Sequence, residues 1–157
     1  MAGTLKVKVE ENIILDNQDY SSKRVFEISS IANITKKIVT IAADDDATVL
    51  VFKSTTAIAD GALDLQTVKY IRITNLDSSN SVNISLQLDS DENNSAADLS
   101  ITHLLEAGRS FLMGAPDEGA HADDDSASIV TALTDFESII IDPGSNSGQV
   151  EVFVAST

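Results

Sequence analysis

Short runs in which apolar and polar residues alternate recur along the chain, separated by clusters of Asn, Asp, Ser and Gly. Alternation with a period of two places successive side chains on opposite faces of a strand. About a dozen such runs at close spacing predict an all-β protein, a two-sheet antiparallel β-sandwich of jelly-roll type. The runs are TLKVKVE (4–10), NIILD (12–16), RVFEIS (24–29), KKIVTIA (36–42), TVLVFK (48–53), VKYIRITN (68–75), VNISLQL (82–88), LSITHLL (99–105), RSFLM (109–113), SIVTAL (128–133), ESIIID (137–142) and VEVFVA (150–155).

Two segments share one layout, YIRITNLDSSNSVNISLQL (70–88) and SIIIDPGSNSGQVEVFVA (138–155). In each, two alternating runs flank a polar turn, which predicts a hairpin with one buried face. The opposite face of the first unit is polar, whereas that of the second carries Ile140 and Phe153. Either another segment of the chain or another subunit must cover these two side chains. Ile140 and Phe153 are therefore candidate interface residues.

Other polar clusters connect or extend the runs. ADDDA (43–47) and EAG (106–108) each join two runs and predict further turns of hairpins. DSDENNSAAD (89–98) and GAPDEGAHADDDSAS (114–128) predict two long acidic loops, because neither has enough apolar surface to fold alone. Each long loop is either mobile or ordered by a neighbouring subunit. With 157 residues, the chain fits a single β-sandwich domain over residues 1–157.

Composition narrows the function classes. Ten basic and 25 acidic side chains give a net charge of −15, and such a surface repels phosphate backbones and anionic lipids. We therefore expect neither nucleic acid nor membrane as a partner, and the charge serves solubility or attracts basic partners or cations. No apolar run approaches about 18 residues, and the N-terminus lacks the apolar core of a secretory signal. Cysteine is absent, which excludes disulfides and thiolate metal sites.

Candidate chemistry is sparse. The two histidines, His103 and His121, belong to no metalloprotease pattern, and neither a nucleophile-elbow nor a phosphate-loop pattern occurs. We therefore expect no enzyme and no catalytic residue. A carbohydrate platform is poorly supported, because Trp is absent and aromatic residues make up 4% of the chain.

A calcium site is the one cofactor that the acidic runs suggest. Asp89, Asp91 and Asn93 match the first ligand positions of an EF-hand loop, but Asn94 stands where Gly is required and Ser100 where Glu is required. Runs of adjacent aspartates are more often solvated turns, since unbridged carboxylates repel one another. The candidate calcium ligands are Asp44, Asp46, Asp89, Asp91, Asp123 and Asp125.

A family resemblance rests on the order of five segments. They are VKVEENIILDNQDYSSKRVFEISSI (7–31), KKIVTIAADDDATVLVFKST (36–55), TVKYIRITNLDSSNSVNISLQL (67–88), LLEAGRSFLM (104–113) and FESIIIDPGSNSGQVEVFVAS (136–156). This order resembles small virion structural proteins of tailed bacteriophages, especially marine ones. The resemblance implies assembly rather than catalysis, as a capsid decoration (cement) protein or, alternatively, a neck, tail or fibre-tip component with a carbohydrate- or calcium-binding adhesion role.

The same resemblance implies where the protein works and with what. The expected location is the virion, after synthesis in the host cytoplasm. The expected partners are further copies of the chain, in a homo-oligomer for which such proteins suggest a trimer, and other virion proteins such as the major capsid protein.

Overall fold

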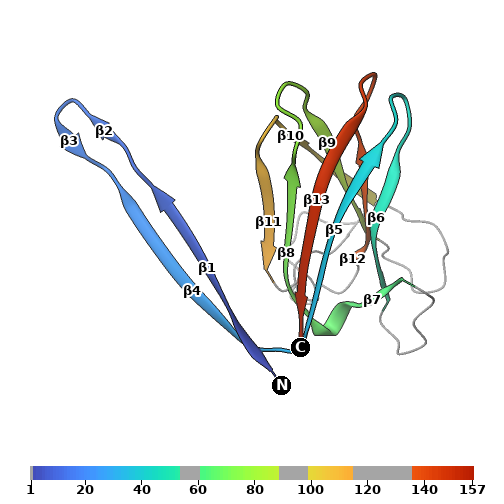
Figure 1. Ribbon diagram of the computed structural model, residues 1–157, viewed down its shortest axis with the longest axis horizontal. Coiled ribbons are helices and arrows are strands. Elements are labelled where there is room, and N and C mark those ends of the chain that lie inside the picture. Colours follow the sequence, from blue (N-terminus) through green and yellow to red (C-terminus); the bar gives the residue numbers. More distant parts are fainter. Residues whose placement is uncertain (1, 54–60, 89–98, 115–135) are drawn as a thin grey trace, which may run out of the picture.

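The computed structural model describes residues 2–53, 61–88, 99–114 and 136–157, most of which lie in strands. Two parts are visible in Figure 1, a sandwich of two β-sheets and a long two-stranded arm that projects from it. The prediction of an all-β sandwich is confirmed. The whole of the predicted acidic loop 89–98, and residues 115–128 of the predicted loop 114–128, lie outside the described residues.

The sandwich is built from nine strands and one short 3-10 helix. They are β5 (Asn33–Ile41), β6 (Ala47–Lys53), β7 (Leu63–Asp64), η1 (Leu65–Thr67), β8 (Val68–Asn75), β9 (Val82–Leu88), β10 (Leu99–Leu105), β11 (Ser110–Gly114), β12 (Phe136–Asp142) and β13 (Gly148–Ser156). One sheet has the strand order β10-β9-β12-β6-β7, and the other has the order β11-β8-β13-β5. Strands that follow one another in sequence occupy matching places in the two sheets, which is the arrangement of a jelly roll.

The polar turns cross between the sheets, so the predicted hairpins are wrong in one respect. β8 is hydrogen-bonded to β11 and β13 rather than to β9, and β12 is hydrogen-bonded to β6 and β9 rather than to β13. The turns at 43–46 and 106–109 likewise join strands of different sheets. A sequence pattern cannot distinguish these cases, because a strand that returns in the facing sheet also turns its apolar side inward.

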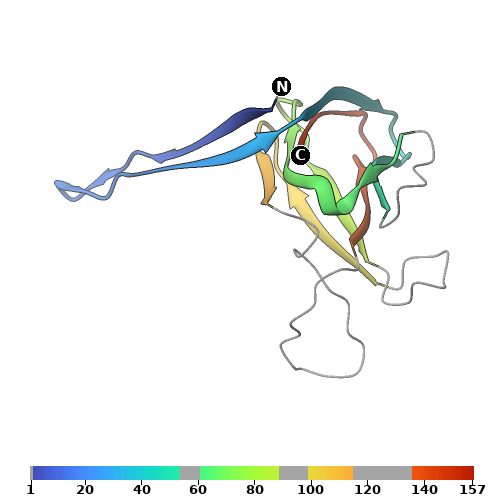
Figure 2. The ribbon, with the colours of Figure 1, turned by 90° about the horizontal axis from the view of Figure 1, so that it is seen from below.

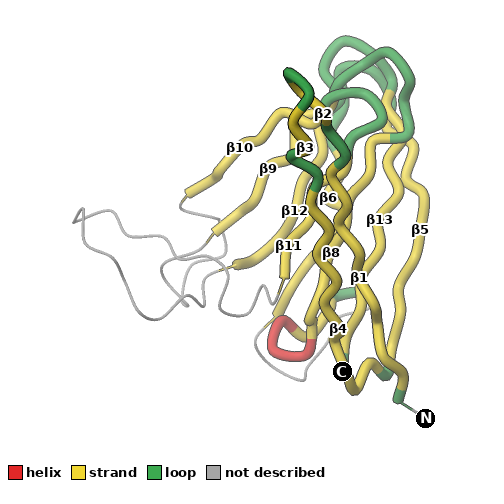
Figure 3. The backbone as a smooth tube through the Cα atoms, turned by 90° about the vertical axis from the view of Figure 1, so that its left-hand side faces the viewer, coloured by secondary structure: helices red, strands yellow, loops and turns green. Residues whose placement is uncertain are grey.

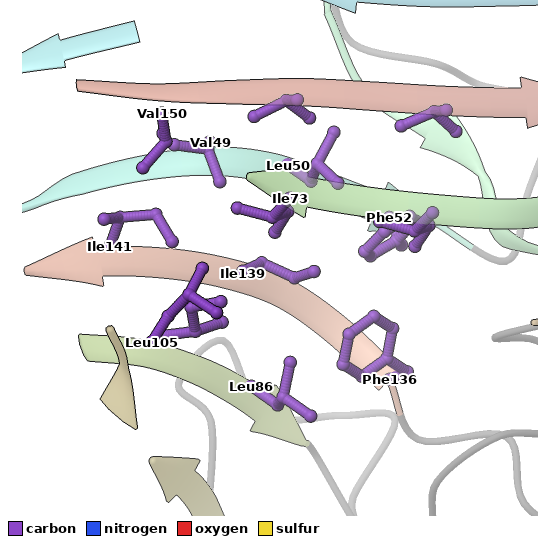
Figure 4. Packing of buried hydrophobic residues seen from close by; sticks show 14 of the residues in the cluster. Val49, Leu50, Phe52, Ile73, Leu86, Leu105, Phe136, Ile139, Ile141 and Val150 are labelled. Carbon is purple, nitrogen blue, oxygen red and sulfur yellow. The ribbon is translucent and has the colours of Figure 1, made fainter. Parts of the chain in front are cut away.

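The apolar faces predicted from the repeated units form the core between the sheets. Figure 4 shows Val49, Ile73, Ile139 and Val150 pointing toward one another from different strands. Ile73, Ile139 and Val150 have no exposed surface, and burying a side chain of this size contributes about 1.5–3 kcal/mol. The predicted core residues that are buried are Ile71, Ile73, Val82, Ile84, Leu86, Ile139, Ile141, Val150, Val152 and Val154.

The arm precedes the sandwich in the chain. β1 (Gly3–Glu11) pairs with β4 (Ser22–Ile31), and the ribbon continues into β2 (Ile14–Leu15) and β3 (Gln18–Asp19). Asp16 and Asn17 form the turn at its end with φ angles of 49° and 65°, as the tight turn of a two-residue hairpin requires. Figures 2 and 3 show the arm running outward from the side of the sandwich that carries β8 and β13.

Candidate assembly interface

The arm is unusually apolar for a segment that stands in solvent. Of the thirteen large hydrophobic residues exposed in the described part of the chain, seven lie on the arm. They are Val9, Ile13, Ile14, Leu15, Tyr20, Val25 and Phe26. They lie on both faces of the ribbon, because Phe26 is paired with Val7 and Val25 with Lys8. An isolated two-stranded ribbon is marginally stable in water, so an apolar one gains from packing against another surface. The arm therefore has the properties of a segment that packs against something else.

Only the base of the arm contacts the sandwich through a described apolar cluster. Its buried members are Val7, Ile31, Tyr70 and Ala155, with Leu5, Ile28 and Phe153 packed against them. The Phe153 ring stands edge-on to that of Tyr70, with centroids 6.1 Å apart. Burial in this cluster raises the pKa of Tyr70. The arm thus covers Phe153 within its own chain, which is the first of the two alternatives that the sequence left open.

Ile140, the other predicted interface residue, lies elsewhere. It is half-buried on the outer face of the opposite sheet, where its neighbours in register are Thr48 and Ser85. Because β12 and β13 belong to different sheets, Ile140 and Phe153 face away from each other and share no surface. The sequence placed them together only because it took 138–155 as one hairpin.

Above the base, the arm and the sheet diverge and leave a groove of about 550 Å³. Its apolar lining comes from Leu5, Val7, Val9, Tyr70, Leu112 and Phe153, and its basic lining comes from Lys6, Lys8, Lys36 and Arg72. Glu10 and Ser110 complete it. We call this space the groove. Lys6 and Lys8 are paired with Glu27 and Glu10 on the arm, so the basic character of the groove comes from Lys36 and Arg72 at its floor, in a chain with an overall charge of −15.

The basic residues at the floor of the groove are held by one carboxylate. Glu151 accepts hydrogen bonds from Arg72 and from Lys36, whose Nζ lies 2.9 Å from Oε2. The hydrogen bond from Lys36 is the main cause that lowers the pKa of Glu151, with a further contribution from Arg72. The Arg72 guanidinium also lies 5.6 Å from the centre of the Phe153 ring, and its buried Nε has no hydrogen-bond partner. Two cations thus share one anion, which leaves positive charge in the groove.

The far part of the arm has the opposite character. Residues 11–22, which we call the arm tip, carry three acidic residues and no basic residue. The tip is internally ordered, because the Tyr20 amide donates to the Ile13 carbonyl at 3.0 Å and the Ser21 amide donates to Asp19 at 2.8 Å. Hydrogen bonds from the hydroxyl and the amide of Ser21 lower the pKa of Asp19. The tip therefore presents apolar side chains on an acidic, preformed turn.

The predicted calcium ligands fall into two groups. Asp44 and Asp46 lie in the turn between β5 and β6, where they and Asp142 line a shallow depression of about 460 Å³. Among the described residues, no group of three or more acidic or histidine side chains is arranged to hold a metal ion. The other candidates, Asp89, Asp91, Asp123 and Asp125, lie outside the described residues, so the calcium hypothesis stays a prediction there.

In the part of the chain that the structure describes, no histidine belongs to a group of metal-ligating side chains. His103 is exposed on β10, with its ring 5.9 Å from that of Phe111, and His121 lies outside the described residues. The one helix in the described ranges is η1, whose three residues are too few to cross a membrane.

Comparisons with known proteins add little. No protein-family model matches the chain, and no curated protein matches its sequence. Among solved structures, a similar chain comes from work described as "Bacillus endospore appendages form a novel family of disulfide-linked pili". It has 15% sequence identity and a TM-score of 0.36, over 79% of this chain and 88% of that chain. The present chain has no cysteine and so forms no disulfide link.

Proposed function

We propose that this protein is a non-enzymatic structural subunit that works by assembling with other protein subunits through its arm. One observation carries the proposal, the projection of an apolar two-stranded ribbon from an otherwise well-packed sandwich. The seven exposed hydrophobic residues of the arm, about half exposed on average, offer on the order of 700 Å² of surface. One partner of a standard protein interface contributes about 800 Å². Because these residues lie on both faces of the ribbon, a partner that covers both faces buries an area that approaches one side of such an interface.

The setting that we propose is the virion of a tailed bacteriophage, with the protein as a capsid decoration subunit that bridges neighbouring subunits of the head. Support comes from the resemblance in segment order. A protein that binds the assembled shell better than its free parts stabilises that shell by mass action. In this role the sandwich is a rigid body, and the arm reaches across a junction to a neighbour.

A paired variant tests the assembly function. Ile14→Ser with Leu15→Ser removes two of the most exposed apolar side chains of the arm, which are 75% and 58% exposed. The matched control is Ile101→Ser with Leu104→Ser, which removes two residues of β10 that are 48% and 56% exposed. Co-sedimentation with purified particles of a tailed phage that encodes the chain measures the result. We expect the arm variant to lose binding at least about tenfold, while the control binds like the parent chain.

Two outcomes contradict the proposal. If the arm variant and the β10 control bind particles equally well, the arm is not the attachment element. If the chain is absent from purified particles, as judged by quantitative mass spectrometry, the virion setting is wrong. The copy number per particle separates a shell protein, present in many copies, from a neck or tail component.

A further inference from the structure

The arm tip and the groove are complementary in charge and in polarity. The tip carries Glu11, Asp16 and Asp19 without a basic residue, whereas Lys36 and Arg72 in the groove share the single carboxylate of Glu151. Both surfaces also carry exposed apolar residues, such as Ile14 on the tip and Leu112 in the groove.

The tip does not occupy the groove of its own chain. β1 alone has nine residues, which at about 3.3 Å per residue spans roughly 30 Å. Figure 1 shows that β2 and β3 lie at the end of the arm farthest from β8 and β13. The arm therefore presents its acidic end to other molecules, while its base forms one wall of its own groove.

We propose that the groove of one copy binds the arm tip of a second copy, so that the chain associates with itself by exchanging arms. This inference rests on the proposed assembly function and names the partner of the arm. The remainder of the chain carries a charge of −14, because the arm with four basic and five acidic residues contributes only −1. Two copies therefore repel each other over most of their surface, and the basic groove is the place where an acidic segment is attracted.

The volume of the groove and the preformed structure of the arm tip are consistent with the tip as the occupant of the groove. A volume of about 550 Å³ lies in the range of about 300–1,000 Å³ typical of ligand pockets. It accepts a few side chains of one turn rather than a second sandwich. The hydrogen bonds within the tip fix its shape before binding, which reduces the conformational entropy lost on association. In the groove, the partly exposed Arg72 guanidinium is bonded to Glu151 through Nη2 and keeps further N–H donors for a carboxylate of the tip.

Disulfide trapping between two different copies tests the inference in a chain that has no cysteine of its own. One copy carries Leu15→Cys on the tip, and a second copy, distinguished by a tag, carries Leu112→Cys in the groove. The matched control replaces the groove cysteine with Thr102→Cys, at an exposed position on β10 of the other sheet. All three replaced residues are exposed, and circular dichroism checks that each variant folds. The two copies are mixed at equal concentration and oxidised mildly, and non-reducing gel electrophoresis measures the tip-to-groove heterodimer.

We expect the tip-to-groove heterodimer to form at least about tenfold faster than the tip-to-Thr102 product, and added salt to slow it because the attraction is electrostatic. Equal rates for the two pairs, or no tip-to-groove product at concentrations where the unmodified chain is oligomeric, overturn the inference. A chain that stays monomeric at every accessible concentration also overturns it. If arm variants still lose particle binding in these cases, the assembly function stands and the partner of the arm is a different protein.

Discussion

The sandwich and the arm are both β-structure, but they obtain their stability in different ways. In the sandwich, alternate residues of two sheets face each other, and residues such as Ile73 and Ile139 are fully buried. In the arm, the same alternation of Leu5, Val7 and Val9 begins half-buried or buried at the base and ends with Val9 at 42% exposure. An apolar strand face is thus buried by the same chain in the sandwich and remains exposed in the arm. The exposed apolar face of the arm is therefore the one available to a partner.

Truncating one isoleucine in each region should give the largest difference in stability. Ile139→Ala removes a fully buried side chain from the core, and we expect it to reduce the free energy of unfolding by about 2–5 kcal/mol. Ile14→Ala in the arm, where the residue is 75% exposed, should change it by less than about 0.5 kcal/mol. Urea unfolding followed by circular dichroism measures both values at a concentration where the chain is monomeric. Similar losses for the two variants would show that the arm belongs to the cooperative fold.

Removing a buried polar side chain near the turns of the sandwich should cause the next largest loss of unfolding free energy. Asn75 has no exposed surface, and its Nδ2 atom donates to the carbonyls of Asn80, Leu105 and Glu106 at 2.8, 3.2 and 3.3 Å. Asn75→Ala leaves these carbonyls without that donor, and we expect a loss of about 1–3 kcal/mol. Asn146→Ala, in an exposed turn, is the control and should unfold like the parent chain. If Asn75→Ala also unfolds like the parent, this contact does not tie the turns together.

A smaller effect should appear where the two regions meet. Phe153→Ala removes the ring that packs against Tyr70 and the arm base, with an expected cost on the order of 1 kcal/mol for the aromatic contact. Amide hydrogen exchange in β1 and β4 should become faster, because the base loses its anchor. Ile140→Ala on the opposite sheet is the control and should leave the exchange of the arm unchanged. If both variants affect the arm equally, the base does not depend on Phe153.

The smallest expected effect is a pH dependence of the stability that Asp77 contributes to the sandwich. Asp77 accepts hydrogen bonds from the amides of Asn80 at 2.8 Å and Ser79 at 2.7 Å, which lower its pKa below the usual 3.8. A carboxyl group with a lower pKa in the folded state stabilises it above the unfolded pKa, and the contribution disappears as the pH falls through the folded pKa. Asp77→Asn should therefore lower the urea midpoint at pH 7 and have less effect near pH 2. A difference of equal size at both pH values would exclude the charge as its cause.

The sequence predicted the fold class and the buried faces because both depend on local alternation. It did not predict the arm, since Leu5, Val7 and Val9 form the same pattern whether their strand enters a sandwich or leaves it. The crossing turns were missed for a related reason, because 77–81 is polar whether the strands on either side of it pair or face each other. Of the two predicted interface residues, Phe153 lines the groove and Ile140 lies on the opposite sheet. The first 31 residues carry a net charge of −1 in a chain of charge −15. This difference is the sequence signal that could have indicated a separate arm.

Hydrogen exchange at two protein concentrations tests the central claim most directly, namely that the sandwich is stable by itself and the arm is completed by a partner copy. In dilute solution, we expect amides of β1 and β4 beyond the base to exchange much faster than those of β8, β9, β12 and β13. Raising the concentration should slow the exchange of the arm and of the groove-lining edge of β11, and leave the centre of the sandwich unchanged. Arm amides that are as protected as the sandwich in dilute solution, or that do not respond to concentration, would contradict the account.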